Sequence, residues 1–326
     1  MARTNRAFEL NRKLRNRIVV AGGSGFIGRL LTDRLVSGEN DVVVLTRSPQ
    51  TAGQSIRLVG WDGRTLGDWA RELEGARALI NLVGQSVNCR YNELNRLDIL
   101  ESRVDSTRVL GEAIARCSKP PPVWLNASTA TIYKHTFDRQ VDEATGEIGA
   151  TPEAKDAFSV EVARAWEEAL FNASTPATRK VALRTAMVFA ASKGGVYRVL
   201  RGLTRWGLGG AIAGGHQYIS WIHEADFCRA VEWLIDRDDF SGPVNLASPN
   251  QIPQREMMRI IRRELGVPFG LPATRRMLEV AAFVHRTEAE LIIKSRRVAP
   301  GRLLASDFQF LFPRMEDAVR EIESRL

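Results

Sequence analysis

The sequence holds few of the residues that build disulfide frameworks or metal centres. Its 326 residues include only three cysteines, far apart and without C-x-x-C spacing, and four histidines without the spacing of metal ligands. An odd number of scattered cysteines argues against a disulfide scaffold, so we expect reduced thiols, a cytoplasmic protein and no metal site. The cysteines are Cys89, Cys117 and Cys228.

Long apolar runs and a strongly charged body are also missing. No uninterrupted apolar stretch approaches the roughly 18 residues of a membrane span, and the N-terminus lacks the apolar core of a secretory signal. The net charge is +8, but residues 1–17 hold six basic side chains against one acid, which leaves only +3 for the rest. We therefore expect a basic tail over residues 1–16, with neither a membrane nor a nucleic acid as partner.

Glycine, by contrast, is concentrated near the start of the chain. Residues 17–28 read R-I-V-V-A-G-G-S-G-F-I-G, an apolar β-branched run with four glycines, and an amphipathic helical pattern follows. This order is typical of a turn where the backbone approaches a pyrophosphate and a helix N-terminus faces it. An ordinary glycine-rich turn would not account for the strand and the helix on its two sides. We predict a dinucleotide-binding turn.

The next apolar strand favours one dinucleotide over the other. Residues 41–46 (D-V-V-V-L-T) lead into Arg47, which lies 19 residues after Gly28. Sites that prefer NAD place an acid there for the ribose 2′-hydroxyl, whereas an arginine can bind a 2′-phosphate with its planar fork. The other interpretation of Arg47 is a solvated loop residue. We predict NADP(H) as the cofactor.

Strand and helix patterns alternate up to about residue 190 and then change. The alternation predicts an α/β fold of the Rossmann type, a doubly wound parallel sheet whose sixth strand covers residues 180–189. Glycine-rich sequence and mainly helical patterns follow, among them helices expected at 273–284 and 288–297. We expect an NADP-binding domain over 17–190 and a smaller, mostly helical substrate lobe over 191–326, covering the carboxyl edge of the sheet.

Several ordered motifs resemble those of one known family. They include G-G-S-G-F-I-G (22–28), N-L-V-G (81–84), S-R-V-D-S-T (102–107), G-G-H-Q-Y-I-S-W-I-H-E-A-D (214–226) and V-A-P-G-R-L-L (298–304). The chain resembles the extended short-chain dehydrogenase/reductases, which include sugar-nucleotide epimerases. More narrowly, it is similar to the atypical branch called "epimerase family" proteins. The resemblance runs from Ile18 to about Arg325.

The resemblance implies roles for the residues that match the family's motifs. Thr129 would donate a hydrogen bond to a substrate carbonyl oxygen during hydride transfer, with a structural strand-end threonine as the alternative. The other matching residues would surround the cofactor. They are the pyrophosphate cradle Gly22, Gly23, Ser24, Gly25, Phe26, Ile27 and Gly28; the 2′-phosphate group Thr46, Arg47 and Ser48; Trp61 and Asp62 near the adenine; and Leu82, Val83 and Gly84 along the middle of the cofactor.

The sequence departs from the family where acid/base chemistry is expected. Standard members carry Tyr-x-x-x-Lys on the helix that corresponds to residues 155–171, where the lysine lowers the pKa of the tyrosine. The matching positions here are Phe158 and Val162 or, one residue on, Ser159 and Ala163. The usual proton relay is therefore absent.

Other polar residues are candidates for the missing roles, each with a structural role as the alternative. Lone polar groups among apolar and aromatic neighbours suit oriented substrate recognition, and a histidine has a suitable ordinary pKa for proton transfer. The candidate acid/base groups are Tyr133, His223 and Glu161, and the candidate substrate contacts are Gln217, Trp221 and Arg302.

Two classes of function fit these residues. The first is an NADP-dependent oxidoreductase acting on a small carbonyl or hydroxyl substrate, within which an epimerase would recycle its hydride internally. The second is a redox sensor or binding module that holds NADP(H) without turnover, which the missing Tyr-x-x-x-Lys favours. Related folds often dimerise through helices such as those expected at 92–116 and 155–171, which makes a homodimer one option.

Overall fold

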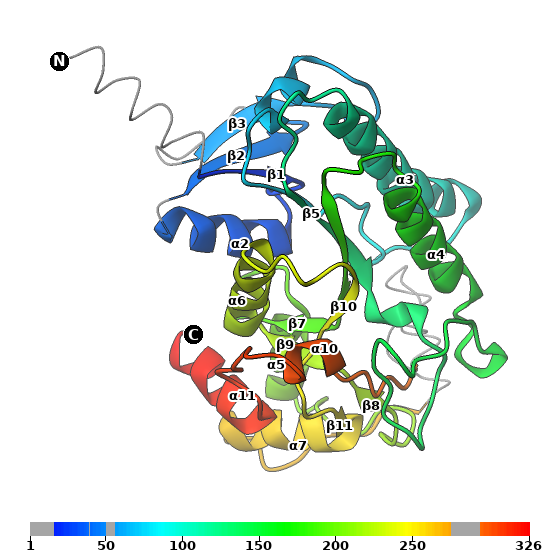
Figure 1. The fold of residues 1–326 in the computed structure, drawn as a ribbon. Coiled ribbons are helices and arrows are strands. Elements are labelled where there is room, and N and C mark those ends of the chain that lie inside the picture. The colour runs from blue at the N-terminus through cyan, green and yellow to red at the C-terminus, as the bar shows by residue number, and fades with distance from the viewer. Residues whose placement is uncertain (1–15, 39, 50–55, 275–293) are drawn as a thin grey trace.

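The computed structural model describes residues 16–38, 40–49, 56–274 and 294–326 (Figure 1). The basic tail expected at residues 1–16 therefore lies almost wholly outside the described residues. So do nearly all of the helix expected at 273–284 and most of the one expected at 288–297. The four described residues of that last range, 294–297, are irregular chain rather than helix.

Seven parallel strands form one sheet at the centre of the fold. Their order is β10-β6-β5-β4-β1-β2-β3, so the order reverses between β1 and β4, where open α/β sheets bind ligands at their carboxyl ends. This arrangement confirms the Rossmann-type fold. The strands are β1 (Arg17–Ala21), β2 (Asp41–Thr46), β3 (Ile56–Gly60), β4 (Ala78–Asn81), β5 (Val123–Thr129), β6 (Arg179–Thr185) and β10 (Gly242–Leu246).

Helices cover both faces of this sheet (Figure 1). Along β1, Ile18 and Val20 point into one apolar core, whereas Val19 and Ala21 point into another. Side chains that alternate between two cores explain why the strands are continuous apolar runs. On the first face lie α2 (Phe26–Ser37) and α6 (Glu224–Ile235), and on the second lie the 3₁₀ helix η1 (Asp68–Leu73), α3 (Glu93–Ala115) and α4 (Ala157–Phe171).

A smaller lobe with its own apolar core lies beyond the ends of β6 and β10. Residues 191–326 build most of it but also supply α6 and β10 to the main layers, so the two expected domain segments interleave. Two short sheets join β7 (Met187–Phe189) to β9 (Trp221–His223) and β8 (Tyr218–Ile219) to β11 (Ile252–Pro253). The lobe's helices are α5 (Val196–Arg205), α7 (Gln254–Glu264) and α11 (Met315–Ser324), whereas α10 (Gly301–Leu304) packs its Leu303 into the core of the main sheet.

The single strand expected over residues 180–189 is two strands in the structure. β6 stays in the main sheet, whereas β7 pairs with β9 in the smaller lobe. At the junction, the Ala186 N–H donates to the Leu246 carbonyl (3.0 Å) and the Met187 N–H donates to the Ser220 carbonyl (3.2 Å). Apolar residues stand on both sides of the junction, in the middle of β6 and throughout β7, so the hydropathy pattern does not mark the residue at which the hydrogen-bonding partner changes.

The outer surface of α3 and α4 exposes apolar side chains. Leu94 and Leu97 on α3 are 74% and 49% exposed, and Phe171 on α4 is 38% exposed. A homodimer through these helices stays a prediction. Among the described residues, no helix combines the length and the apolar character needed to cross a bilayer.

Candidate dinucleotide site and adjoining pocket

The glycine turn after β1 is held by contacts that leave no room for side chains at two positions. Gly22 has a φ of +79°, a left-handed conformation, and a Cβ there would stand 2.9 Å from the Leu82 carbonyl carbon. A Cβ on Gly28 would stand 2.6 Å from the Gly23 Cα and would collide with the Gly22 carbonyl oxygen. These two glycines therefore let the turn pack against β4 and against the first turn of α2.

Gly25 differs, because no chain packing requires a glycine there. A Cβ on Gly25 would meet only the Gly22 carbonyl oxygen, at an ordinary 3.5 Å, and the residue faces a pocket. It precedes α2, whose first N–H groups have no partner within the helix and carry the positive end of the helix dipole. The open face of the turn thus suits a phosphate approaching the backbone closely.

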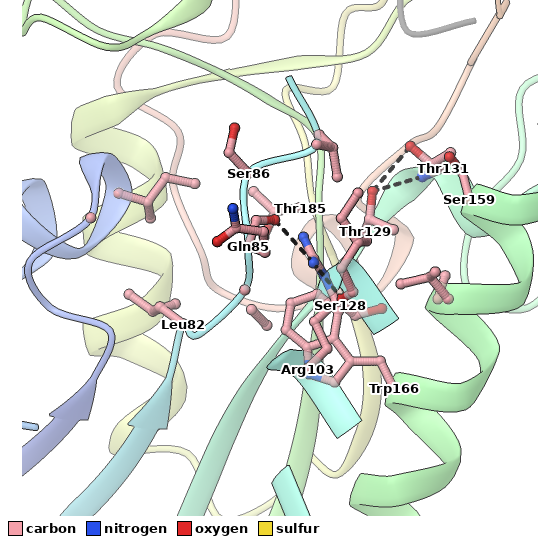
Figure 2. Close-up of a pocket in the computed structure, with 18 of the residues that line it drawn as sticks. Leu82, Gln85, Ser86, Arg103, Ser128, Thr129, Thr131, Ser159, Trp166 and Thr185 are labelled. Atoms are coloured by element: carbon pink, nitrogen blue, oxygen red, sulfur yellow. Dashed lines mark hydrogen bonds between the residues drawn. The ribbon is translucent and has the colours of Figure 1, made fainter. Parts of the chain in front are cut away.

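This pocket has a volume of about 490 Å³ and lies at the carboxyl ends of β1, β4, β5 and β6, with α3 and α4 forming one wall (Figure 2). The structure brings many of the residues implied by the family resemblance to its lining. They are Gly22, Gly25, Phe26, Ile27, Gly28, Leu82, Gly84 and Thr129. Gly23, Ser24 and Val83 stand beside these residues in the chain but do not line the pocket.

Residues at the end of β2 lie beside the glycine turn rather than in the pocket. β2 pairs with β1 in parallel register, with Leu45 opposite Ala21, so Thr46 and Arg47 follow at the same sheet edge as the turn. Thr46 is buried and accepts a hydrogen bond from the Ser48 N–H (3.3 Å). Arg47 and Ser48 are exposed. The guanidinium is therefore accessible next to the turn, where a 2′-phosphate would need it.

Trp61 and Asp62 follow β3 at this same edge. Trp61 is buried and packs edge-on against Trp69, with ring centroids 5.1 Å apart, and its backbone N–H donates to the Thr46 carbonyl (3.1 Å). The Asp62 carboxylate accepts the Thr65 hydroxyl and the N–H groups of Arg64 and Thr65, which lowers its pKa to about 2. Neither residue lines the pocket, so their place near an adenine stays a prediction.

The opposite end of the pocket is lined by hydroxyl groups. Thr129, at the end of β5, donates to the Thr131 hydroxyl (3.1 Å) and accepts from the Thr131 N–H (3.1 Å). Ser128 donates to Glu167 at 2.6 Å, and Ser159 lines the pocket from α4 (Figure 2). Thr129 is thus a hydroxyl at the pocket wall, already oriented by its neighbour.

The wall formed by α4 carries no acid/base pair. Phe158, Ser159, Val162 and Ala163 all line the pocket, so both possible registers of Tyr-x-x-x-Lys face it with neither a phenol nor an ammonium group. Among the described lining residues, the ionisable side chains are Tyr91 and Arg103. No group of three histidine, cysteine or acidic residues suited to a metal ion occurs in the part of the chain that the structure describes.

Tyr133, one of the candidate acid/base groups, points into the interior and has the alternative, structural role. Its side chain is 1% exposed, and its hydroxyl donates to Asn245 (2.9 Å) and accepts from Arg184 (2.8 Å). Burial raises the pKa of the phenol. Arg184 also binds both carboxylate oxygens of Glu167, so Tyr133 belongs to a buried network between β5, β6 and β10. Glu161, the other carboxylate considered, is exposed on α4 and does not line the pocket.

His223 also serves the fold rather than the pocket. It is 1% exposed and caps α6, because its Nδ1 accepts the Ala225 N–H (3.1 Å) while its Nε2 lies 2.9 Å from a Glu321 carboxylate oxygen. Burial lowers the pKa of the imidazole, although Glu321 opposes that shift. A neutral imidazole is needed for Nδ1 to accept the capping hydrogen bond.

The three candidate substrate contacts lie away from the pocket. The Trp221 side chain is fully buried, and its indole N–H donates to the Asn250 carbonyl (2.8 Å). Arg302 donates to the carbonyls of Ser241 and Pro243. Gln217 is buried and borders a separate hollow of about 460 Å³. The polar groups of Trp221 and Arg302 therefore donate hydrogen bonds to backbone carbonyls within the protein.

The fold and the glycine turn together define a Rossmann-type α/β protein with a dinucleotide-binding turn. The chain belongs to the NAD dependent epimerase/dehydratase family, whose model matches residues 18–247. Residues 277–322 match a domain of unknown function, DUF1731. The family resemblance carried by the sequence motifs is thereby confirmed.

Relatives of similar length match almost the whole chain. Human epimerase family protein SDR39U1 is 27% identical over 311 residues, covering 94% of this chain and 99% of the relative. YfhF of Bacillus subtilis (strain 168) is also 27% identical, covering 94% and 97%. The crystal structure of human SDR39U1 (isoform 2) with NADPH has a TM-score of 0.82 at 28% identity, covering 95% of this chain and 100% of that one. That structure holds the type of cofactor predicted here.

We predict that His223 makes the free energy of unfolding depend on pH. Its imidazole is held neutral in the fold but takes up a proton when unfolded below a pKa of about 6.5, so stability is present above that pH and is lost as the pH falls. The loss is expected to approach 1.4 kcal/mol per pH unit at most.

The measurement is urea unfolding between pH 7.5 and 5 for the wild type and His223→Asn, which keeps a capping side chain. The variant should lose less stability on acidification than the wild type. An identical slope for the wild type and His223→Asn would contradict the buried neutral state.

Proposed function

We propose that the chain binds NADP(H) across the glycine turn and uses it to reduce or oxidise a small carbonyl or hydroxyl compound in the adjoining pocket. The observation that carries this proposal is the open face of Gly25, where neither packing nor backbone conformation demands a glycine but a phosphate would. When bound, the cofactor supplies or accepts the hydride. The related human structure with NADPH supports the choice of cofactor.

One end of the site would bind the phosphates of the cofactor, and the other end would bind the substrate. Arg47 would bind the adenosine 2′-phosphate with its guanidinium fork, and the N-terminus of α2 would face the diphosphate. At the other end, Thr129 would donate a hydrogen bond to the substrate oxygen, which requires only that its hydrogen turn away from Thr131. Tyr133 and His223 would contribute through the fold and not through the reaction.

A second function is a redox sensor that binds NADP(H) without turnover. The specific observation in its favour is the wall of α4, where Phe158, Val162 and Ala163 leave the expected acid/base positions apolar. Within the catalytic proposal, an epimerase that recycles its hydride internally is the remaining variant.

Isotope transfer separates these possibilities. Purified protein, a small-molecule cell extract and NADPH deuterated at either face of the nicotinamide C4 would be incubated together and read by mass spectrometry. A deuterated metabolite is the expected result and would also name the substrate. If NADPH binds in the same sample but no metabolite is labelled, the result would favour the redox sensor or the epimerase that recycles its hydride.

Two glycine variants test the site at the turn. Gly25→Asp should fold normally, because its Cβ has room and aspartate is a good helix cap, but its carboxylate should repel the diphosphate and weaken NADPH binding at least about 100-fold. Gly28→Ala should lower the free energy of unfolding of the cofactor-free protein by about 2–3 kcal/mol through its backbone clash. Fluorescence titration and urea unfolding measure the two effects, and undiminished NADPH binding by Gly25→Asp would overturn the proposed site.

Arg47 is expected to set the preference for NADP(H). Arg47→Ala should weaken NADPH binding by about 10- to 100-fold, the value of a charge-assisted hydrogen-bond pair, and leave NADH binding unchanged. The matched control is Arg71→Ala, which removes another exposed arginine, one paired with Asp68 at 3.0 Å. Equal losses for the two cofactors would show that Arg47 does not contact the 2′-phosphate.

A further inference from the structure

Arg103 on α3 brings a positive charge to the pocket without a negative partner among the described residues. Its hydrogen bonds go to backbone carbonyls: Nη1 donates to Ile99 (2.8 Å) and to Gln85 (3.1 Å). No hydrogen bond or ion pair joins it to a carboxylate in the part of the chain that the structure describes. Burial dominates its environment and lowers its pKa to about 10, with only Tyr91 opposing that shift.

The side chain is nonetheless held firmly in place. Its guanidinium carbon lies 5.0 Å from the centroid of the Trp166 ring, and a Cβ on Gly84 would stand 2.9 Å from it. Arg103 is therefore fixed between the end of β4 and α4, as Figure 2 shows, with its head at the pocket wall. The two bonds through Nη1 leave Nε and Nη2 without a hydrogen-bonding partner among the described residues.

A largely buried arginine usually pairs with an acid. Arg96 on the same helix donates to the Tyr91 carbonyl at 3.0 Å, whereas Arg108 pairs with acids. Arg108, one and a half turns further on, binds Glu112 at 2.6 Å and lies 4.0 Å from Asp105. Asp105 also lies 3.6 Å from Arg64. Asp105 and Glu112 are thus engaged on the outer face of this helix, and a partly buried cation remains on its inner face. Such a charge is costly until an anion neutralises it.

We propose that Arg103 binds an oxyanion inside the pocket through the fork formed by Nε and Nη2. Two sources fit this chemistry: a phosphate oxygen of NADP(H), or the carboxylate or phosphate group of a small substrate lying beside the cofactor. A planar guanidinium binds either of them with two parallel hydrogen bonds. The inference rests on the proposed function, because it places an anion in the same pocket.

The second source would restrict the substrate class. Arg103 and the hydroxyls of Thr129 and Ser159 line one pocket, so a substrate held by its anionic group would have its carbonyl within reach of hydroxyl donors. An oxo acid or a phosphorylated carbonyl compound meets that requirement. An uncharged sugar or alcohol would leave the arginine without an anion.

The test compares Arg103→Gln with Arg108→Gln, which removes the same charge from the solvent-facing side of the same helix. NADPH binding is measured by fluorescence titration. Binding of oxalate and of inorganic phosphate is measured by calorimetry on both the free and the NADP⁺-loaded protein. Thermal melting confirms that each variant folds, and Arg103→Lys, which keeps the charge but loses the fork, serves as a second variant.

A loss of NADPH affinity of about 10-fold or more in Arg103→Gln, with Arg108→Gln unchanged, would assign the anion to the cofactor. Unchanged NADPH affinity with loss of oxalate or phosphate binding would assign it to the substrate. Wild-type affinities of Arg103→Gln for all three probes would overturn the inference while leaving NADP(H) binding intact. If the wild type binds no NADPH, the proposed function fails, and the oxalate and phosphate titrations of the free protein still decide the role of Arg103.

Discussion

The close approach of the glycine turn to β4 and α2 is the constraint on which the site depends. Gly22 and Gly28 allow contacts that any side chain would break, and these contacts aim the N-terminus of α2 at the point where the strand order reverses. β1 and α2 then leave Gly25 open to the pocket. Binding capacity therefore follows from backbone geometry, with side chains adding selectivity at the two ends.

Ionisable groups near the pocket hold strands of the main sheet and α4 together. Glu167 and Arg184 neutralise each other, Tyr133 joins them to Asn245, and Ser128 connects this network to the pocket wall. Such a buried pair is costly to break, because removing one partner leaves the other charge uncompensated. Among the described residues that line the pocket, the polar side chains left for a ligand include hydroxyls and one cation, Arg103, set among apolar side chains. This composition suits orientation and charge neutralisation better than proton transfer.

The sequence predicts local geometry well and distant pairing poorly. The glycine spacing and the β-branched runs predicted the turn and the central strands, since both depend on residues close in the chain. Tyr133 and His223 were candidates for catalysis, but their partners Asn245 and Glu321 lie 112 and 98 residues further along the chain. Hydropathy carries no signal for such pairs. Arg103 lies in the S-R-V-D-S-T motif (102–107), near other charged residues. Only the packing of Gly84 and Trp166 around its side chain distinguishes it from the exposed arginines of this helix.

A crystal structure of this chain grown with NADPH tests the account most directly. The account predicts density for the diphosphate over Gly25, the 2′-phosphate within hydrogen-bonding distance of Arg47, and the nicotinamide in the hydroxyl-lined end of the pocket near Thr129. A cofactor bound elsewhere, or bound with the 2′-phosphate turned away from Arg47 and the nicotinamide outside the pocket, would contradict it.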